Sequence, residues 1–128
     1  MGPSSQIAIQ SETGEAHFWA LVAPLLLQPG IRRSMMMGYR CVQVEGAIFA
    51  MWDRREHAMV IKLPEARAEE LLDRRRAQPF APNGRPFRQW VAVPVRRRRS
   101  WGALLEEAHR YVRSLPPPKP RPRRPPRS

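Results

Sequence analysis

Apolar residues recur at helical spacing near the start of the chain. Four of them are separated by three or four positions and therefore share one face of a helix: Phe18, Leu21, Val22 and Leu25. Ser11 and Thr13 precede this stripe, and their hydroxyl groups are suited to cap a helix N-terminus. Pro24 is expected to kink or shorten the helix, because it lacks an N–H and its ring crowds the preceding turn, and Pro29-Gly30 is expected to end it.

Short apolar and alternating runs follow this helix and predict β-strands. They are residues 34–37, 41–45, 47–52 and 58–62. Glu45 and Gly46 are suited to a tight turn between two of these runs, and residues 53–56 form a polar loop. Parallel neighbours need a crossover of about a dozen residues or more, so connections this short predict an antiparallel meander.

The second half of the chain predicts two helices separated by a strand. The first helix begins near Pro64, which suits a first helical turn, and it buries Ala68, Leu71 and Leu72. Residues 90–93 form the last strand.

Ser100 is expected to cap the last helix. The apolar stripe of this helix consists of Trp101, Leu104, Leu105, Ala108, Val112 and Leu115. The order of elements predicts an α+β fold. In it, an N-terminal helix and two helices from the second half pack against an antiparallel meander of four to five strands.

The 128 residues suffice for one domain with its own core. We expect a flexible N-terminus over residues 1–14, the folded domain over residues 15–115, and a disordered basic tail over residues 116–128 (the tail). Seven of the 13 tail residues are proline, which is incompatible with a helix or a central strand.

Cysteine usage and apolar runs favour a cytoplasmic protein. Cys41 is the only cysteine, so no intrachain disulfide can form. Residues 1–10 lack the basic and then apolar pattern of a signal peptide. The longest apolar run, residues 18–27, is interrupted by proline and falls short of the roughly 20 residues that span a membrane. No membrane association is therefore expected.

The net charge of +12 is concentrated in the last quarter of the chain. Residues 1–95 hold 12 basic and 9 acidic residues, whereas residues 96–128 hold 11 basic and 2 acidic residues. The excess comes from the arginine run, which is Arg96, Arg97, Arg98 and Arg99, and from five tail residues. The tail residues are Lys119, Arg121, Arg123, Arg124 and Arg127.

Clustered arginines beside a mobile arm are suited to phosphate backbones and predict weak, nonspecific binding of nucleic acid. Two other interpretations stay open. The basic residues of the tail are also typical of a solvated terminus that aids solubility, and its prolines of a polyproline ligand for a partner protein.

Several segments, in this order along the chain, resemble the TfoX N-terminal domain family. They are Met36-Met37-Gly38-Tyr39, residues 46–50, Val60-Ile61-Lys62, Gly84-Arg85-Pro86-Phe87, Trp90-Val91 and Ser114-Leu115-Pro116-Pro117. The resemblance covers the chain from about Glu15 to Lys119. Met37 stands where the family usually has an aromatic residue, and Tyr39 stands at its second glycine.

The resemblance implies a role linked to bacterial competence and transcription. Because the sequence contains no catalytic constellation, we expect a binding or regulatory module rather than an enzyme, with no cofactor and no metal, as a monomer or a homodimer. As a partner we expect nucleic acid or another protein.

Few residues suggest catalytic or metal-binding chemistry. His17, His57 and His109 lie on separate predicted elements, and Cys41 has no second cysteine. A zinc site or a Cys–His nucleophile would have to assemble across the fold. We therefore expect a buried Cys41 and histidines at surface or edge positions.

Two further features allow alternative interpretations. Met35, Met36 and Met37 suggest either an adaptable binding groove or a buried strand, and their apolar neighbours favour the strand. Arg85, between Gly84 and Pro86, is placed to bind a carboxylate or phosphate. We favour an ion pair of Arg85 with Glu45 or Asp53 that pins the loop. The alternative hypothesis, that the protein is a small enzyme, requires a pocket around Arg85, Trp90 and His57.

Overall fold

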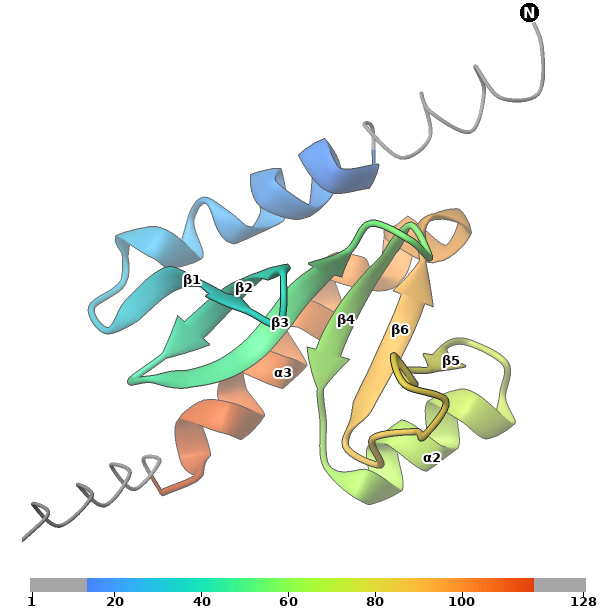
Figure 1. The fold of residues 1–128 in the computed structure, drawn as a ribbon. Coiled ribbons are helices and arrows are strands. Elements are labelled where there is room, and N and C mark those ends of the chain that lie inside the picture. Colours follow the sequence, from blue (N-terminus) through green and yellow to red (C-terminus); the bar gives the residue numbers. More distant parts are fainter. Residues whose placement is uncertain (1–13, 117–128) are drawn as a thin grey trace, which may run out of the picture.

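The structure, a computed structural model, describes residues 14–116. The proposed helix caps Ser11 and Thr13 lie outside the described residues, as do all tail residues after Pro116. A helix over residues 14–22 opens the described part (Figure 1). It is followed by η1 (Leu25–Leu27), β1 (Ile31–Met36), β2 (Tyr39–Val44), β3 (Ala47–Asp53), β4 (Ala58–Lys62), α2 (Glu65–Asp73), β5 (Gln78–Pro79), β6 (Trp90–Pro94), η2 (Val95–Ser100) and α3 (Trp101–Ser114).

The strands form one sheet in the order β1-β2-β3-β4-β6-β5, and all neighbouring strands are antiparallel. The predicted α+β class with an antiparallel meander is thus confirmed. Two-residue turns join the first three strands, and both central residues of each turn have positive φ: 50° and 83° at Met37 and Gly38, 49° and 83° at Glu45 and Gly46. Such turns match the right-handed twist of the strands that they connect.

One face of the sheet, the helix face, packs against the N-terminal helix, α2 and α3 (Figure 1). Phe18 and Val22 from the N-terminal helix are fully buried there. The helix ends before Pro24, so Pro24 shortens it rather than kinking it, and the predicted end at Pro29-Gly30 is wrong. A register shift between β2 and β3 skips Phe49, so Phe49 and the next residue, Ala50, both join this core.

Helix α3 buries five of the six residues of the predicted stripe, and one more residue joins it; Leu115 follows the helix end and is half-buried. Trp101, Leu104, Leu105, Ala108 and Val112 are buried together with His109. The expectation of a surface histidine is wrong for His109, because its position lies on the stripe and its ring packs 5.3 Å from that of Phe49. Burial lowers the pKa of His109.

The predicted cap at Ser100 is wrong. The chain is already helical before α3, because η2 runs directly into it, and Ser100 has helical φ and ψ of −87° and −10°. Its hydroxyl group donates to the carbonyl of Arg97 at 2.8 Å and caps no free N–H of α3. A capping residue needs a non-helical backbone, which η2 removes.

The strands at both edges of the sheet differ from the predicted bounds. β1 begins at Ile31 and includes Arg32 and Arg33, so it extends beyond the expected apolar run. The Arg33 guanidinium lies 4.7 Å from the centre of the ring of Trp19, a residue of the N-terminal helix. This is a cation–π contact, in which the ring attracts the positive charge of Arg33. The two-residue strand β5 is too short to show a sequence pattern and was not predicted.

The other face of the sheet, the open face, carries a smaller core, and none of the helices within residues 14–116 packs over it. It buries Cys41, Met51, Ala58, Val60, Phe80 and Ala92. Residues 80–88, the crossing loop, cover part of this face. Phe80 is buried, its ring stacks on that of Phe87 at 5.9 Å, and the Phe87 N–H donates to the Phe80 carbonyl at 3.0 Å.

No helix within residues 14–116 combines the length and the apolar character that crossing a bilayer requires.

Candidate nucleic-acid interface

The arginine run lies on η2, at the end of β6. Arg96, Arg97, Arg98 and Arg99 are all exposed. A 3₁₀-helix has about three residues per turn and about 2 Å rise per residue, so four consecutive side chains leave a short stretch of backbone in several directions. The result is a dense positive cluster rather than one flat stripe.

The β3–β4 turn brings two more arginines to the same end of the sheet. Arg54 and Arg55 are exposed in this turn. Ala58 pairs with Pro94, and the Val95 N–H donates to the His57 carbonyl at 3.2 Å, so the turn lies beside the start of η2. Figure 1 shows the two segments side by side at the same ends of β4 and β6. We call these six residues the arginine end: Arg54, Arg55, Arg96, Arg97, Arg98 and Arg99.

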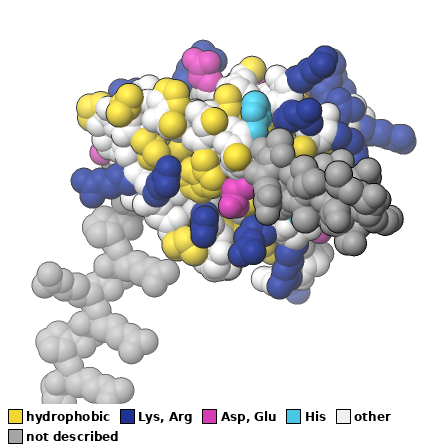
Figure 2. Space-filling model, turned by 90° about the horizontal axis from the view of Figure 1, so that it is seen from above, with side chains coloured by type: hydrophobic (Ala, Val, Ile, Leu, Met, Phe, Trp, Pro, Cys, Tyr) yellow, Lys and Arg dark blue, Asp and Glu magenta, His cyan; other side chains and the backbone are white. Residues whose placement is uncertain are grey.

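The charge of the arginine end is poorly balanced. None of its six side chains forms an ion pair with another residue in the described range 14–116. Dark blue Lys and Arg side chains gather toward the right of the view in Figure 2, which looks down on the molecule from the top of Figure 1. Like charges held together without acidic partners attract anions and speed their encounter with the protein.

Asp53 holds the β3–β4 turn in place. Its side chain is almost fully buried at 4% exposure, and its Oδ1 accepts the N–H groups of Arg55 at 3.0 Å and Glu56 at 3.2 Å. This carboxylate therefore fixes the backbone from which Arg54 and Arg55 project.

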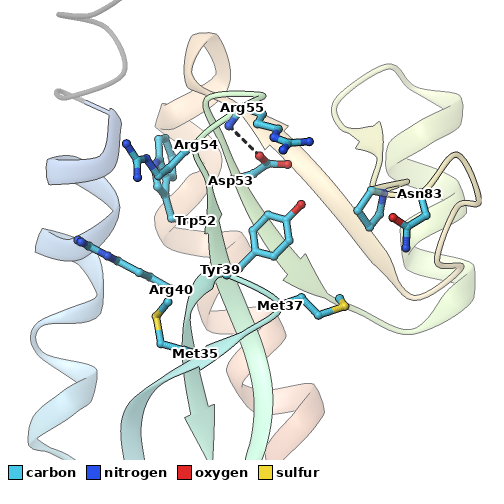
Figure 3. A pocket seen from close by; sticks show the side chains of 11 residues that line it. Met35, Met37, Tyr39, Arg40, Trp52, Asp53, Arg54, Arg55 and Asn83 are labelled. Atoms are coloured by element: carbon cyan, nitrogen blue, oxygen red, sulfur yellow. Dashed lines mark hydrogen bonds between the residues drawn. The ribbon is translucent and has the colours of Figure 1, made fainter.

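A groove of about 730 Å³ adjoins the arginine end (Figure 3). Its side chains come from the β1–β2 hairpin, the end of β3, the β3–β4 turn and the crossing loop. The residues are Met35, Met37, Gly38, Tyr39, Arg40, Trp52, Asp53, Arg54, Arg55, Pro82 and Asn83. A second hollow of about 390 Å³ shares Tyr39, Asp53, Arg55 and Pro82 with it and therefore lies beside it; we call the first, larger hollow the groove.

Tyr39 stands in the middle of the groove, and its hydroxyl group points toward Asp53 and Arg55 (Figure 3). Its ring packs edge-on against Phe80 at 5.7 Å. Burial, and then the negative charge of Asp53, raise the pKa of Tyr39, so the phenol is protonated at neutral pH and can donate a hydrogen bond.

Of the three methionines expected in a buried strand, Met36 is half-buried against the core of the open face. Met35 is 64% exposed, Met37 in the turn after β1 is 63% exposed, and both line the groove. β1 is an edge strand, and its hairpin with β2 turns at Met37, so no element within residues 14–116 covers these two side chains. The alternative interpretation, an adaptable groove lined by methionine, is the one that the structure supports.

Arg85 does not pin its loop as predicted. Its side chain is exposed in the crossing loop, and no ion pair joins it to Glu45 or Asp53 in the part of the chain that the structure describes. Asp53 is instead engaged with backbone N–H groups, whereas the Glu45 side chain lies beside Gly30.

The hypothesis that the protein is an enzyme requires a pocket around Arg85, Trp90 and His57, and these residues do not form one. Trp90 pairs with Lys62 at one end of β4, and His57 precedes Ala58 at the other end. None of the three residues lines the groove.

Cys41 is buried, as predicted, and its Sγ donates to the Tyr39 carbonyl at 3.3 Å. Burial raises the pKa of the Cys41 thiol to about 11. No group of three or more His, Cys, Asp or Glu residues within the described range is arranged to hold a metal ion.

The thiol of Cys41 is expected to resist alkylation in the folded protein. With a pKa near 11 in place of 9, its thiolate fraction at pH 8 falls about a hundredfold, and burial also blocks access. Iodoacetamide labelling at pH 8, followed by mass spectrometry, should be at least about a hundredfold slower in buffer than in concentrated urea. Equal rates in the two solvents would contradict the buried position.

The raised pKa of Cys41 also sets the direction in which the stability of the fold changes with pH. Between about pH 9 and pH 11 the unfolded thiol ionises while the folded thiol stays protonated, so this group lowers the stability of the fold as the pH rises through that window. Below pH 9 it contributes no pH dependence. Cys41→Ala should remove this contribution.

Sequence reasoning selected the arginine run but missed Arg54, Arg55 and Tyr39. The only sequence signal for the first two was their position in the polar loop after β3. Tyr39 was visible as a departure from the glycine of the TfoX N-terminal pattern. The predicted tail contacts Lys119, Arg121, Arg123, Arg124 and Arg127 lie outside the described residues.

Comparison of the chain with protein-family models, with curated proteins and with solved structures finds no match. The resemblance to TfoX N-terminal domains therefore stays a prediction.

Proposed function

We propose that the protein is a nucleic-acid-binding module that holds the phosphate backbone electrostatically through the arginine end. The observation that carries this proposal is the convergence of Arg54 and Arg55 with the arginine run at one end of the sheet. All six side chains are exposed, and guanidinium groups match phosphate oxygens in geometry and charge.

The proposed mode of binding reads no sequence. Contacts from arginine side chains to phosphates position a protein on nucleic acid without distinguishing bases. The tail residues Lys119, Arg121, Arg123, Arg124 and Arg127 are proposed to extend the same contact. The resemblance to TfoX N-terminal domains supports a regulatory role linked to transcription or competence, and binding without catalysis.

The test is the salt dependence of binding, measured by fluorescence anisotropy with a labelled DNA duplex. Six phosphate contacts should give a slope of log K against log salt of about −5, which corresponds to a loss of about 10³-fold between about 50 and 200 mM salt. A variant with Arg96, Arg97, Arg98 and Arg99 all changed to Gln should make this slope shallower by about 3 to 4 units and weaken binding about 10- to 100-fold at low salt.

The matched control removes the same charge from the opposite end of β4 and β6, around α2 (Figure 1). Arg74, Arg75, Arg76 and Arg88 are exposed there and are changed together to Gln. The control should keep the slope of the unmodified protein. An equal loss in both variants would mean that binding follows net charge alone, which would contradict the proposal. So would a loss confined to a variant of the five basic tail residues.

A further inference from the structure

The groove and the arginine end share two residues. Arg54 and Arg55 line the groove and also belong to the arginine end. A nucleic-acid strand whose phosphates lie along the arginine end therefore passes the mouth of the groove. A base attached to those phosphates is therefore within reach of the groove.

The lining of the groove matches the parts of a single nucleotide. Arg55 projects from the β3–β4 turn on the side of Asp53 and is suited to a phosphate, whereas Arg54 extends toward Trp52 (Figure 3). Tyr39 offers an aromatic ring, and the exposed side chain of Met37 and Pro82 add apolar surface beside it. Stacking of a base on an aromatic side chain is a recurring mode of single-strand binding.

Polar groups that can meet the edge of a base lie beside this ring. Asn83 in the crossing loop faces Tyr39 across the groove (Figure 3), and its amide can donate and accept at once. The protonated hydroxyl group of Tyr39 is a further donor. The volume of about 730 Å³ lies within the range of small-ligand sites, about 300–1,000 Å³.

The shape of the groove favours an unpaired nucleotide over a base pair. The crossing loop on one side and the β1–β2 hairpin on the other bound the groove, so a base reaches Tyr39 only when one of its faces and its pairing edge are free. In a duplex both faces of each base are stacked and its pairing edge is engaged.

We propose that the groove binds an unpaired nucleotide of a nucleic-acid strand, with the base against Tyr39 and Asn83 and its phosphate on Arg55. This inference rests on the proposed binding of the phosphate backbone by the arginine end. It adds a preference for single strands and unpaired ends over blunt duplexes.

The experiment compares a labelled oligothymidine strand with a blunt duplex of equal phosphate number, using the full-length protein. The single strand should bind about tenfold more tightly at the same salt, as one stacked base contributes on this scale. Tyr39→Ala should abolish this preference by weakening single-strand binding about tenfold, while duplex binding stays unchanged. Tyr39→Phe should retain most of the preference, because the ring remains.

Asn83→Ala is a second test that stays valid if Tyr39→Ala fails to fold. Asn83 is exposed, and its side chain makes no hydrogen bond within residues 14–116. It should lower single-strand affinity two- to threefold, on the order of one modest hydrogen bond, and leave duplex affinity unchanged.

The outcomes separate this inference from the proposed function. If neither probe binds, the proposed function fails. If both bind equally, or if the Tyr39 and Asn83 variants weaken both probes alike, only the groove inference fails. Displacement of the labelled strand by free thymidine monophosphate at a lower concentration than by the unlabelled strand would overturn the assignment to a strand-borne nucleotide.

Discussion

Replacing Trp101 with alanine is expected to lower the free energy of unfolding by about 3–5 kcal/mol. Trp101 is fully buried at the first turn of α3, and its Nε1–H donates to the Val93 carbonyl at 3.0 Å. Its ring packs edge-on against Trp52 at 5.9 Å and lies 5.7 Å from the ring of His17. The substitution therefore leaves a large cavity where α3, β6 and the N-terminal helix meet, and it leaves the Val93 carbonyl without this donor.

Urea unfolding followed by far-ultraviolet circular dichroism measures this loss. A domain of this size has a stability on the order of 5–15 kcal/mol, so the variant should unfold at a much lower urea concentration. Trp101→Phe is the matched control. It fills most of the space and loses the hydrogen bond, and it should cost about 1–2 kcal/mol. A cost below about 1 kcal/mol for Trp101→Ala would show that α3 does not dock through this residue.

Replacing Asp53 with alanine is expected to cost about 2–3 kcal/mol, the second largest of the effects proposed for this protein. The buried carboxylate accepts two backbone N–H groups, at 3.0 and 3.2 Å, and hydrogen bonds to charged groups are stronger than neutral ones. Removing it frees the β3–β4 turn, and with it Arg54 and Arg55. The variant should therefore weaken nucleic-acid binding as well as the fold.

Asp53→Asn separates the two roles of this residue. The amide keeps an acceptor oxygen for the turn and removes the charge, so it should recover about half of the lost stability. Glu56→Ala, in the same turn but exposed, should leave the free energy of unfolding within about 0.5 kcal/mol of that of the unmodified protein. Equal costs for Asp53→Ala and Glu56→Ala would contradict the anchoring role of Asp53.

Local patterns in the sequence predicted most of the elements. β4 follows a continuous apolar run and α3 an apolar stripe at helical spacing, and both are buried where these patterns place them. Errors arose where a neighbouring element changed the local rule. Ser100 does not cap α3 because η2 precedes it. His109 is buried because it lies on the apolar stripe of α3, although histidine is a polar residue type.

The candidate site was predictable only in part, for a reason of chain topology. The arginine run is contiguous, so composition alone revealed it. Arg54 and Arg55 stand more than 40 positions earlier, and only the pairing of Ala58 with Pro94 brings them beside it. No sequence pattern predicts which strands become neighbours when β6 inserts beside β4 after a helix and a short edge strand.

The sequence by itself determined the α+β class, the order of helices and strands, and the location of the excess positive charge. Each of these depends on periodicity, turn chemistry or composition, which act over a few residues. The tertiary structure alone decided that Met35 and Met37 stay exposed, that Tyr39 lines a groove, and that this groove adjoins six arginines. Those properties depend on contacts between segments far apart in the chain, and such contacts exist only once the sheet has formed.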